Sequence, residues 1–159
     1  GEVMGIDKNV GLAYMKSQMG AGQILPSKGT VFISVNDRDK KESVFVAKIF
    51  DEIGFKIMAT RGTARFLQKN NIPVQVVNKV YEGRPNVIDH IKNGEIDLLI
   101  NTSSDKKTVQ DSSSLRQATI LYQIPYTTTI AGARAIALAI KEKSSCGLEV
   151  KSIQEYYSL

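Results

Sequence analysis

The sequence has little of what disulfide-linked, metal-binding and membrane-spanning proteins need. It contains one cysteine, Cys146, one histidine, His90, and no tryptophan among 159 residues. A single cysteine excludes an internal disulfide and a cysteine-rich zinc site, and a single histidine excludes a multi-histidine metal site. No apolar run approaches the ~18–20 residues of a membrane-spanning helix. The sequence therefore favours a reduced, cytoplasmic protein with no membrane partner.

The charge balance is modestly basic. Lysine and arginine number 21 against 16 aspartate and glutamate residues, a net charge of +5. This excess suits an anionic partner, but it is spread along the chain and lacks the interleaved aromatics of a nucleic-acid-binding face. Hydrophobic residues make up 42% and charged residues 23%, as in an ordinary globular domain. One folded domain is expected, and no nucleic acid partner.

Short apolar runs alternate with segments of helical length. Strands are predicted at 30–35, 55–60, 74–78, 97–101 and 124–128, and helices at 7–20, 40–53, 62–70, 86–93, 111–123 and 131–143. Asp7 is predicted to cap the first helix and Asp111 the fifth. The second, third and fourth strands are rich in Val, Ile and Leu, which is typical of strands buried on both faces. This order predicts a Rossmann-like three-layer α/β/α sandwich of about five parallel strands. The tail after Gly147 is expected to dock as a final strand or a helical turn.

Polar side chains follow the predicted strands. Ligands of an open parallel sheet bind beyond the carboxyl ends of its strands, so these positions are the candidates for a site. They are mostly Thr, Asn, Ser and Lys, which can hold an anion through hydrogen bonds and ammonium charge. Lys40 follows the first strand and Lys79 the third, so the geometry of the sheet could bring both side chains to one site at its carboxyl edge. Taken singly, each fits a solvated lysine better than a ligand-binding one, since most charged residues are exposed.

The most informative motif is Thr60-Arg61-Gly62-Thr63, directly after the second strand. A glycine here would let the backbone turn tightly into the next helix, with two hydroxyls beside the exposed amides of the helix start. Phosphate is the natural ligand of such a helix start. The alternative is a turn in which Thr63 merely caps the helix, and the motif alone leaves both open.

Motifs of several catalytic classes are absent. The chain has no G-x-x-x-x-G-K-[ST] loop, no G-x-G-x-x-G after a strand and no G-x-S-x-G. Acidic residues such as Asp37, Asp39 and Glu82 follow strands, but no spacing marks two of them as an acid–base pair. His90 falls inside a predicted helix, where a surface or packing role is the usual one. The site is therefore predicted to hold an anion and not to break bonds, with no metal and no cofactor.

Short stretches spread over the whole chain carry a family resemblance. They are Gly1-Glu2-Val3-Met4-Gly5, Phe32-Ile33-Ser34-Val35, Asp39-Lys40, Ala59-Thr60-Arg61-Gly62-Thr63-Ala64, Val77-Asn78-Lys79-Val80, Glu82-Gly83-Arg84-Pro85, Ile91-Lys92-Asn93-Gly94, Ile100-Asn101-Thr102 and Tyr126-Thr127-Thr128. Together they resemble the carboxyl-terminal allosteric domain of the carbamoyl-phosphate synthase large chain. The resemblance implies a methylglyoxal-synthase-like fold over residues 25–159. Residues 1–24 would be the junction and N-terminal helix from a preceding synthetase unit.

The resemblance also implies an excised, non-catalytic part of a larger enzyme. That enzyme would be an ATP-dependent, glutamine-hydrolysing ligase that makes carbamoyl phosphate for pyrimidine and arginine biosynthesis. It would use ATP, Mg or Mn, and K, none of them bound by this part. The implied partners are the synthetase units of the same large chain and the small glutaminase subunit. A homo-oligomer is left as an open alternative.

Ligands follow from the resemblance as well. Family members bind the nucleotide effectors UMP or IMP at the carboxyl ends of the strands. The matching phosphate-binding positions are Lys40, Thr60, Gly62 and Thr63. The matching nucleoside-binding positions are Ser34, Lys79, Asn101, Ser103, Lys106 and Lys107, with Ser103 in place of a family threonine and the two lysines in place of arginines found in some members. Tyr126 and Thr128 match an ornithine site that a neighbouring unit completes, so this part alone should bind ornithine poorly.

A sister activity of the same fold is the alternative. Methylglyoxal synthase holds a triose phosphate and abstracts a proton with an aspartate that follows a Gly-Gly pair. The matching stretch here is Glu82-Gly83-Arg84-Pro85, which places Arg84 where that base should stand, and His90 does not match the family's active-site histidine. Proton abstraction needs a positioned acceptor, so the resemblance favours an effector-binding domain over a phosphosugar lyase.

Overall fold

The computed structural model describes residues 2–102 and 109–157, and one five-stranded sheet organises them. The strand order is β3-β2-β1-β4-β5, and every neighbouring pair is parallel. The strands are β1 (Thr30–Ser34), β2 (Lys56–Thr60), β3 (Gln75–Val77), β4 (Leu98–Asn101) and β5 (Tyr126–Thr127). The predicted fold of five parallel strands is confirmed. The strand order reverses at β1, so a crevice is expected at the carboxyl ends of β1 and β4.

Alternating side chains of the central strands enter two separate cores. In β1, Val31 and Ile33 face one core, and Phe32 between them faces the other. In β4, Leu98 and Ile100 likewise face the first core, and Leu99 between them faces the second. Successive side chains of a strand point to opposite faces, so this burial requires helices on both sides of the sheet.

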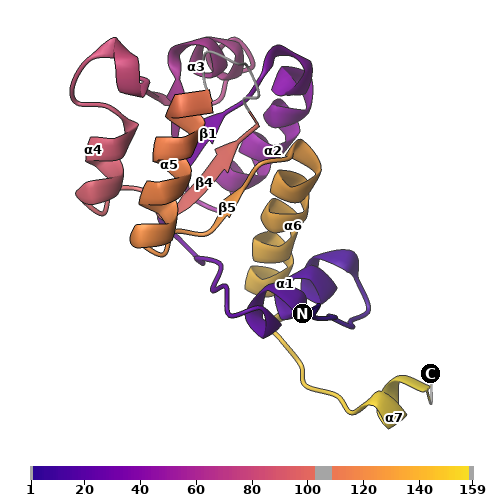
Figure 1. Ribbon diagram of the computed structural model, residues 1–159. Helices are drawn as coiled ribbons and strands as arrows, with labels where there is room; N and C mark the ends of the chain where they lie inside the picture. The colour runs from indigo at the N-terminus through magenta and orange to yellow at the C-terminus, as the bar shows by residue number, and fades with distance from the viewer. Residues whose placement is uncertain (1, 103–108, 158–159) are drawn as a thin grey trace.

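Helices cover both faces of the sheet (Figure 1). They are α1 (Val10–Gly20), α2 (Lys40–Glu52), α3 (Arg61–Gln68), α4 (Val87–Lys92), α5 (Val109–Leu121), α6 (Ile130–Cys146) and α7 (Ile153–Tyr157), with the 3-10 helices η1 (Asp37–Asp39) and η2 (Val80–Glu82). Helices α2, α3 and α6 pack on one core, and α4 and α5 on the other. The result is the predicted three-layer sandwich.

Three local predictions were wrong. The third strand is not buried on both faces, because β3 lies at the sheet edge and leaves Val76 47% exposed. The first helix is capped by Asn9, whose side-chain oxygen accepts a hydrogen bond from the Leu12 amide at 2.8 Å, and not by Asp7. The fifth helix begins at Val109, so Asp111 lies inside it.

Helix α1 packs against α6 and adds the buried Met15 to the same core. Gly11 permits this contact: a Cβ at this position would lie 2.9 Å from Cγ of Glu142 and 3.0 Å from the carbonyl oxygen of Leu138. The Asn9 side-chain amide also donates to the Glu142 carboxylate at 3.3 Å. The helix expected to belong to a preceding unit is therefore fitted closely to α6.

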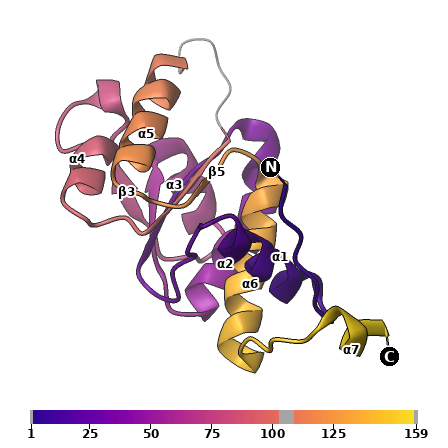
Figure 2. The same cartoon turned by 60° about the horizontal axis from the view of Figure 1, so that its bottom comes forward.

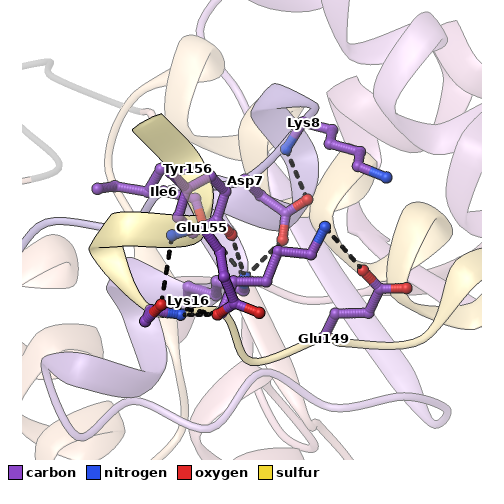
Figure 3. A network of polar contacts seen from close by, with 9 residues as sticks. Ile6, Asp7, Lys8, Lys16, Glu149, Glu155 and Tyr156 are labelled. Atoms are coloured by element: carbon purple, nitrogen blue, oxygen red, sulfur yellow. Dashed lines mark hydrogen bonds and ion pairs between the residues drawn. The ribbon is translucent and has the colours of Figure 1, made fainter. Parts of the chain in front are cut away.

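The segment that precedes α1 passes close to α7 (Figure 2). Polar contacts join the two in a cluster that we call the terminal clasp, formed by Ile6, Asp7, Lys16 and Tyr156 (Figure 3). The Tyr156 hydroxyl donates to the Ile6 carbonyl at 3.0 Å and accepts from the Lys16 ammonium at 3.0 Å. The same ammonium pairs with the Asp7 carboxylate at 2.7 Å. The tail thus docks as a helical turn, α7, one of the two forms expected for it.

Candidate functional site

The start of α3 lies at the carboxyl end of β2, next to the point where the strand order reverses. Thr60 is its N-cap residue but makes no capping bond with its side chain. Strand β2 ends at Thr60 and α3 begins at Arg61, so the chain turns directly from the strand into the helix, as predicted. Gly62 is the second residue of the helix and has no positive φ, so this turn does not depend on a left-handed glycine. Among the atoms of residues 2–102 and 109–157, a Cβ at Gly62 would have only the Lys40 ammonium within 4 Å, at 3.9 Å. The glycine therefore leaves space in front of the first amides of α3.

Three buried hydroxyls line the wall beside this helix start. Ser34, Thr60 and Thr63 are 6%, 5% and 1% exposed. The Thr60 hydroxyl donates to Thr63 Oγ1 at 3.5 Å, and Ser34 Oγ lies 3.3 Å from Thr60 Oγ1. Each hydroxyl carries one proton, so Ser34 donates to Thr60 and the chain of donors ends at Thr63.

Thr63 joins α3 to the central strand. Its hydroxyl oxygen accepts a hydrogen bond from the Val35 amide at 3.2 Å, and it is the third residue of the helix, not its cap. The simpler alternative, in which Thr63 caps α3, therefore fails. Within residues 2–102 and 109–157, no acceptor receives the hydroxyl proton of Thr63, which leaves that proton available to a ligand oxygen.

Lys40 brings positive charge to the same place. It is the first residue of α2 and follows η1, and its ammonium lies beside Gly62. The ammonium also pairs with the Asp37 carboxylate at 2.7 Å. This hydrogen bond holds the pKa of Asp37 below its ordinary value, so the carboxylate is ionised at neutral pH. The helix start, the hydroxyls and the ammonium together make a site suited to an anion.

The neighbouring strand ends border the site. Asn101 pairs with Ser34 across β4 and β1, which places it at the same edge of the sheet. Lys79 lies two residues beyond Val77, the register partner of Thr60, and its backbone amide donates to the Glu82 carboxylate at 3.0 Å. The structure thus brings together Ser34, Lys40, Thr60, Gly62, Thr63 and Asn101, with Lys79 at the adjacent strand end.

Asn36 holds the site together, although it was not predicted from the sequence as a site residue. Its side-chain amide donates to the Thr102 carbonyl at 3.0 Å and to the Asp39 carboxylate at 2.8 Å. Its backbone amide donates to the Thr102 hydroxyl at 3.3 Å. These bonds tie the loop that carries Lys40 to the end of β4. Its position directly after the first strand was the available signal.

The remaining candidate residues lie elsewhere or outside the description. Ser103, Lys106 and Lys107 lie outside the described residues. Tyr126 lies in β5 opposite Leu99 and lines a cavity of about 420 Å³ with Gln23, Ile24 and Thr119 among others. Thr128 is exposed and does not line that cavity. The contribution of these two residues to an ornithine site stays a prediction.

Other kinds of site have no counterpart in the part of the chain that the structure describes. No group of three or more His, Cys, Asp or Glu side chains there could hold a metal ion. No helix in the same residues is long and apolar enough to cross a membrane. His90, in α4, donates a hydrogen bond from Nδ1 to the Glu95 carboxylate at 2.6 Å.

The fold is that of an α/β domain whose polar candidate residues gather at the carboxyl ends of its parallel strands. The MGS-like domain family matches residues 42–128, more than half of the chain. The chain belongs to this family.

Relatives extend the match to nearly the whole chain. The carbamoyl phosphate synthase large chain of Rhizobium meliloti is 51% identical over 99% of this chain, and that of Nostoc is 50% identical over 98%. The chain spans only 14% of the length of each. The large chain "C-terminal section" of Aquifex aeolicus is 48% identical over the full chain, which covers 30% of it. The crystal structure of ForH is a remote likeness, with 16% identity over 77% of this chain and 82% of that one and a TM-score of 0.43, and carries no argument.

Proposed function

We propose that this domain binds a nucleotide monophosphate, UMP or IMP, at the carboxyl edge of its sheet. The observation that supports it best is the convergence of uncapped helix amides, a chain of buried hydroxyls and the Lys40 ammonium at the start of α3. A phosphate dianion accepts several hydrogen bonds at once and is stabilised by helix-start amides and by positive charge. Lys40, Thr60, Gly62 and Thr63 would hold the phosphate.

The nucleoside would extend from the phosphate along the strand ends. Asn101 and Ser34 lie on the β1–β4 side, and Lys79 lies on the β3 side. Ser103, Lys106 and Lys107 would complete the contacts on the β4 side. Tyr126 and Thr128 would contribute to an ornithine site only together with another unit.

We propose further that the domain regulates a carbamoyl phosphate synthase large chain, in which residues 1–24 join it to a synthetase unit. The whole cytoplasmic enzyme would include the glutaminase subunit and use ATP to make carbamoyl phosphate for pyrimidine and arginine biosynthesis. Contacts between copies of the domain are compatible with this role. An effector bound here would alter activity only by binding two states of the enzyme with different affinity.

Isothermal titration calorimetry of the 159-residue chain with UMP, IMP and inorganic phosphate tests the proposal. Lys40→Ala should weaken nucleotide binding about tenfold to a hundredfold, because a charge-assisted hydrogen bond to the phosphate is lost. Lys48→Ala is the matched control, since Lys48 is an exposed lysine on the same helix. Absence of heat with both nucleotides at millimolar concentration, or equal losses in the two variants, would contradict the proposal.

The phosphosugar lyase alternative gains no support from the position expected to hold its base. The Arg84 side chain there is 78% exposed and lies 3.7 Å from the Asp89 carboxylate. A guanidinium cannot accept a proton at neutral pH. Dihydroxyacetone phosphate should therefore yield no methylglyoxal with this protein, and measurable turnover would reverse the ranking.

A further inference from the structure

The Lys40 ammonium lies close to two groups of the described residues. It is 3.9 Å from the position that a Cβ of Gly62 would occupy. It is also 2.7 Å from the Asp37 carboxylate. The Asp37 side chain is 93% exposed, whereas that of Lys40 is 25% exposed. The ion pair is therefore open to solvent at its carboxylate, and an anion that binds the ammonium meets this carboxylate as well.

We propose that Asp37 competes with the ligand phosphate for the Lys40 ammonium and so lowers the affinity of the site for its ligand. This inference rests on the proposed function and concerns the same site. A phosphate that reaches Lys40 must either displace the Asp37 carboxylate or lie close to it. Displacement breaks an ion pair, and close approach brings two negative charges together, so either course weakens binding.

The loop is built so that the Asp37 side chain can move while its backbone stays in place. Asn36 caps η1 by accepting from the Asp39 amide at 3.1 Å, and its side chain holds the Asp39 carboxylate and the Thr102 carbonyl. Asp37 itself has the Lys40 ammonium as its ion-pair partner among the described residues. Exposed ion pairs of this kind are weak, so a ligand of higher charge can replace the carboxylate at small cost.

The competition predicts a gain of binding on removal of one carboxylate. Asp37→Asn should tighten binding of UMP, and of inorganic phosphate, about two- to fivefold, which is the range expected for an exposed ion pair. Misfolding of the variant would weaken binding. Tighter binding by Asp37→Asn therefore cannot be explained by misfolding.

Asp39→Asn is the matched control. It removes the same charge from the same 3-10 helix, and its side-chain oxygen can still accept from Asn36. Any general gain in attraction for anions appears in both variants, whereas release of Lys40 appears only in Asp37→Asn. In a Lys40→Met background the difference between the two variants should vanish, because the contested ammonium is gone.

The outcomes separate the inference from the proposed function. If the unaltered protein binds UMP but Asp37→Asn binds no tighter than Asp39→Asn, the inference fails and the proposed function stands. If the difference persists with Lys40→Met, competition for Lys40 is likewise overturned. If neither the unaltered protein nor any variant binds UMP or phosphate by calorimetry, both the inference and the proposed function fail.

Discussion

At the scale of single residues, a substitution at Gly62 should affect the stability of the fold and the affinity for the ligand in opposite directions. Alanine has room at this helical position in the unliganded protein, since the nearest atom to its Cβ is 3.9 Å away. Gly62→Ala should therefore raise the free energy of unfolding by about 0.5–1 kcal/mol through helix propensity. The same methyl group would occupy the approach to the first amides of α3 and should weaken UMP binding about tenfold or more. Urea denaturation and calorimetry measure the two effects, and a variant that binds UMP normally would contradict the account.

A second prediction at this scale concerns the Thr63 hydroxyl. Thr63→Val keeps the shape of the side chain but leaves the buried Val35 amide without its acceptor, which should lower the free energy of unfolding by about 1–3 kcal/mol. It also removes the last donor of the hydroxyl chain and should weaken phosphate binding. Thr63→Ser retains the hydroxyl and serves as the control. If both variants lose binding equally, the hydroxyl is not what matters.

Residues of the site could be predicted where the signal lies within a short stretch of sequence. Lys40, Thr60 and Thr63 lie at or shortly after the ends of apolar runs, and the carboxyl ends of parallel strands meet, so they could be placed at one edge of the sheet. Their phosphate-binding roles came from the family resemblance. The link between Asn36 and Thr102 could not, since it joins positions 66 residues apart through side-chain geometry. The helix predicted to start at Gly62 was found to begin one residue earlier, at Arg61, so its start was predictable from the glycine after the strand.

At the scale of elements, the terminal clasp holds two segments that contribute little to the cores. Tyr156→Phe removes the hydroxyl that bonds both Ile6 and Lys16, and should release α7 and the first residues while the sheet stays folded. Hydrogen exchange should rise in residues 148–157 and 2–8 and not in β1. Tyr157→Phe is the control, because the Tyr157 side chain is 87% exposed. Unchanged exchange in Tyr156→Phe, or equal exchange in both variants, would contradict a holding role for Tyr156.

The clasp should also open in acid. The hydrogen bond from Lys16 is the main cause that holds the pKa of Asp7 below its ordinary value of 3.8, against an opposing effect of burial. Because the folded pKa is the lower one, Asp7 stabilises the clasp fully above its unfolded pKa, and this contribution is lost as pH falls through the folded pKa. Hydrogen exchange of the tail should rise with acid below about pH 4. Asp7→Asn should abolish this rise, and an unchanged rise would assign it to another group.

Strands could be predicted where the apolar pattern of a segment matches its burial in the sheet. The apolar runs of β1, β2 and β4 lie at the sheet centre and were assigned correctly. The run before Asn78 is as apolar as these, yet it forms the edge strand β3. Strand order is decided by contacts between distant segments, so composition alone could not distinguish an edge from a centre.

At the scale of the whole molecule, the sheet places the proposed site and the terminal clasp on different elements. The site is built from the ends of β1, β2 and β4 with the starts of α2 and α3, and the clasp from α1, α7 and the segment before α1. Changes in the clasp should therefore leave the UMP affinity of the 159-residue chain within about twofold. A larger change in Tyr156→Phe, by calorimetry, would show that the two are coupled through α6.

The most direct test of the central claim is a nuclear magnetic resonance titration of the 15N-labelled chain with UMP and with inorganic phosphate. Both ligands should shift the backbone amides of Arg61, Gly62 and Thr63 and that of Val35, and UMP should additionally shift Asn101. Lys40→Ala should reduce these shifts at equal ligand concentration. Shifts that spare the start of α3, or that gather at another face of the protein, would contradict the account.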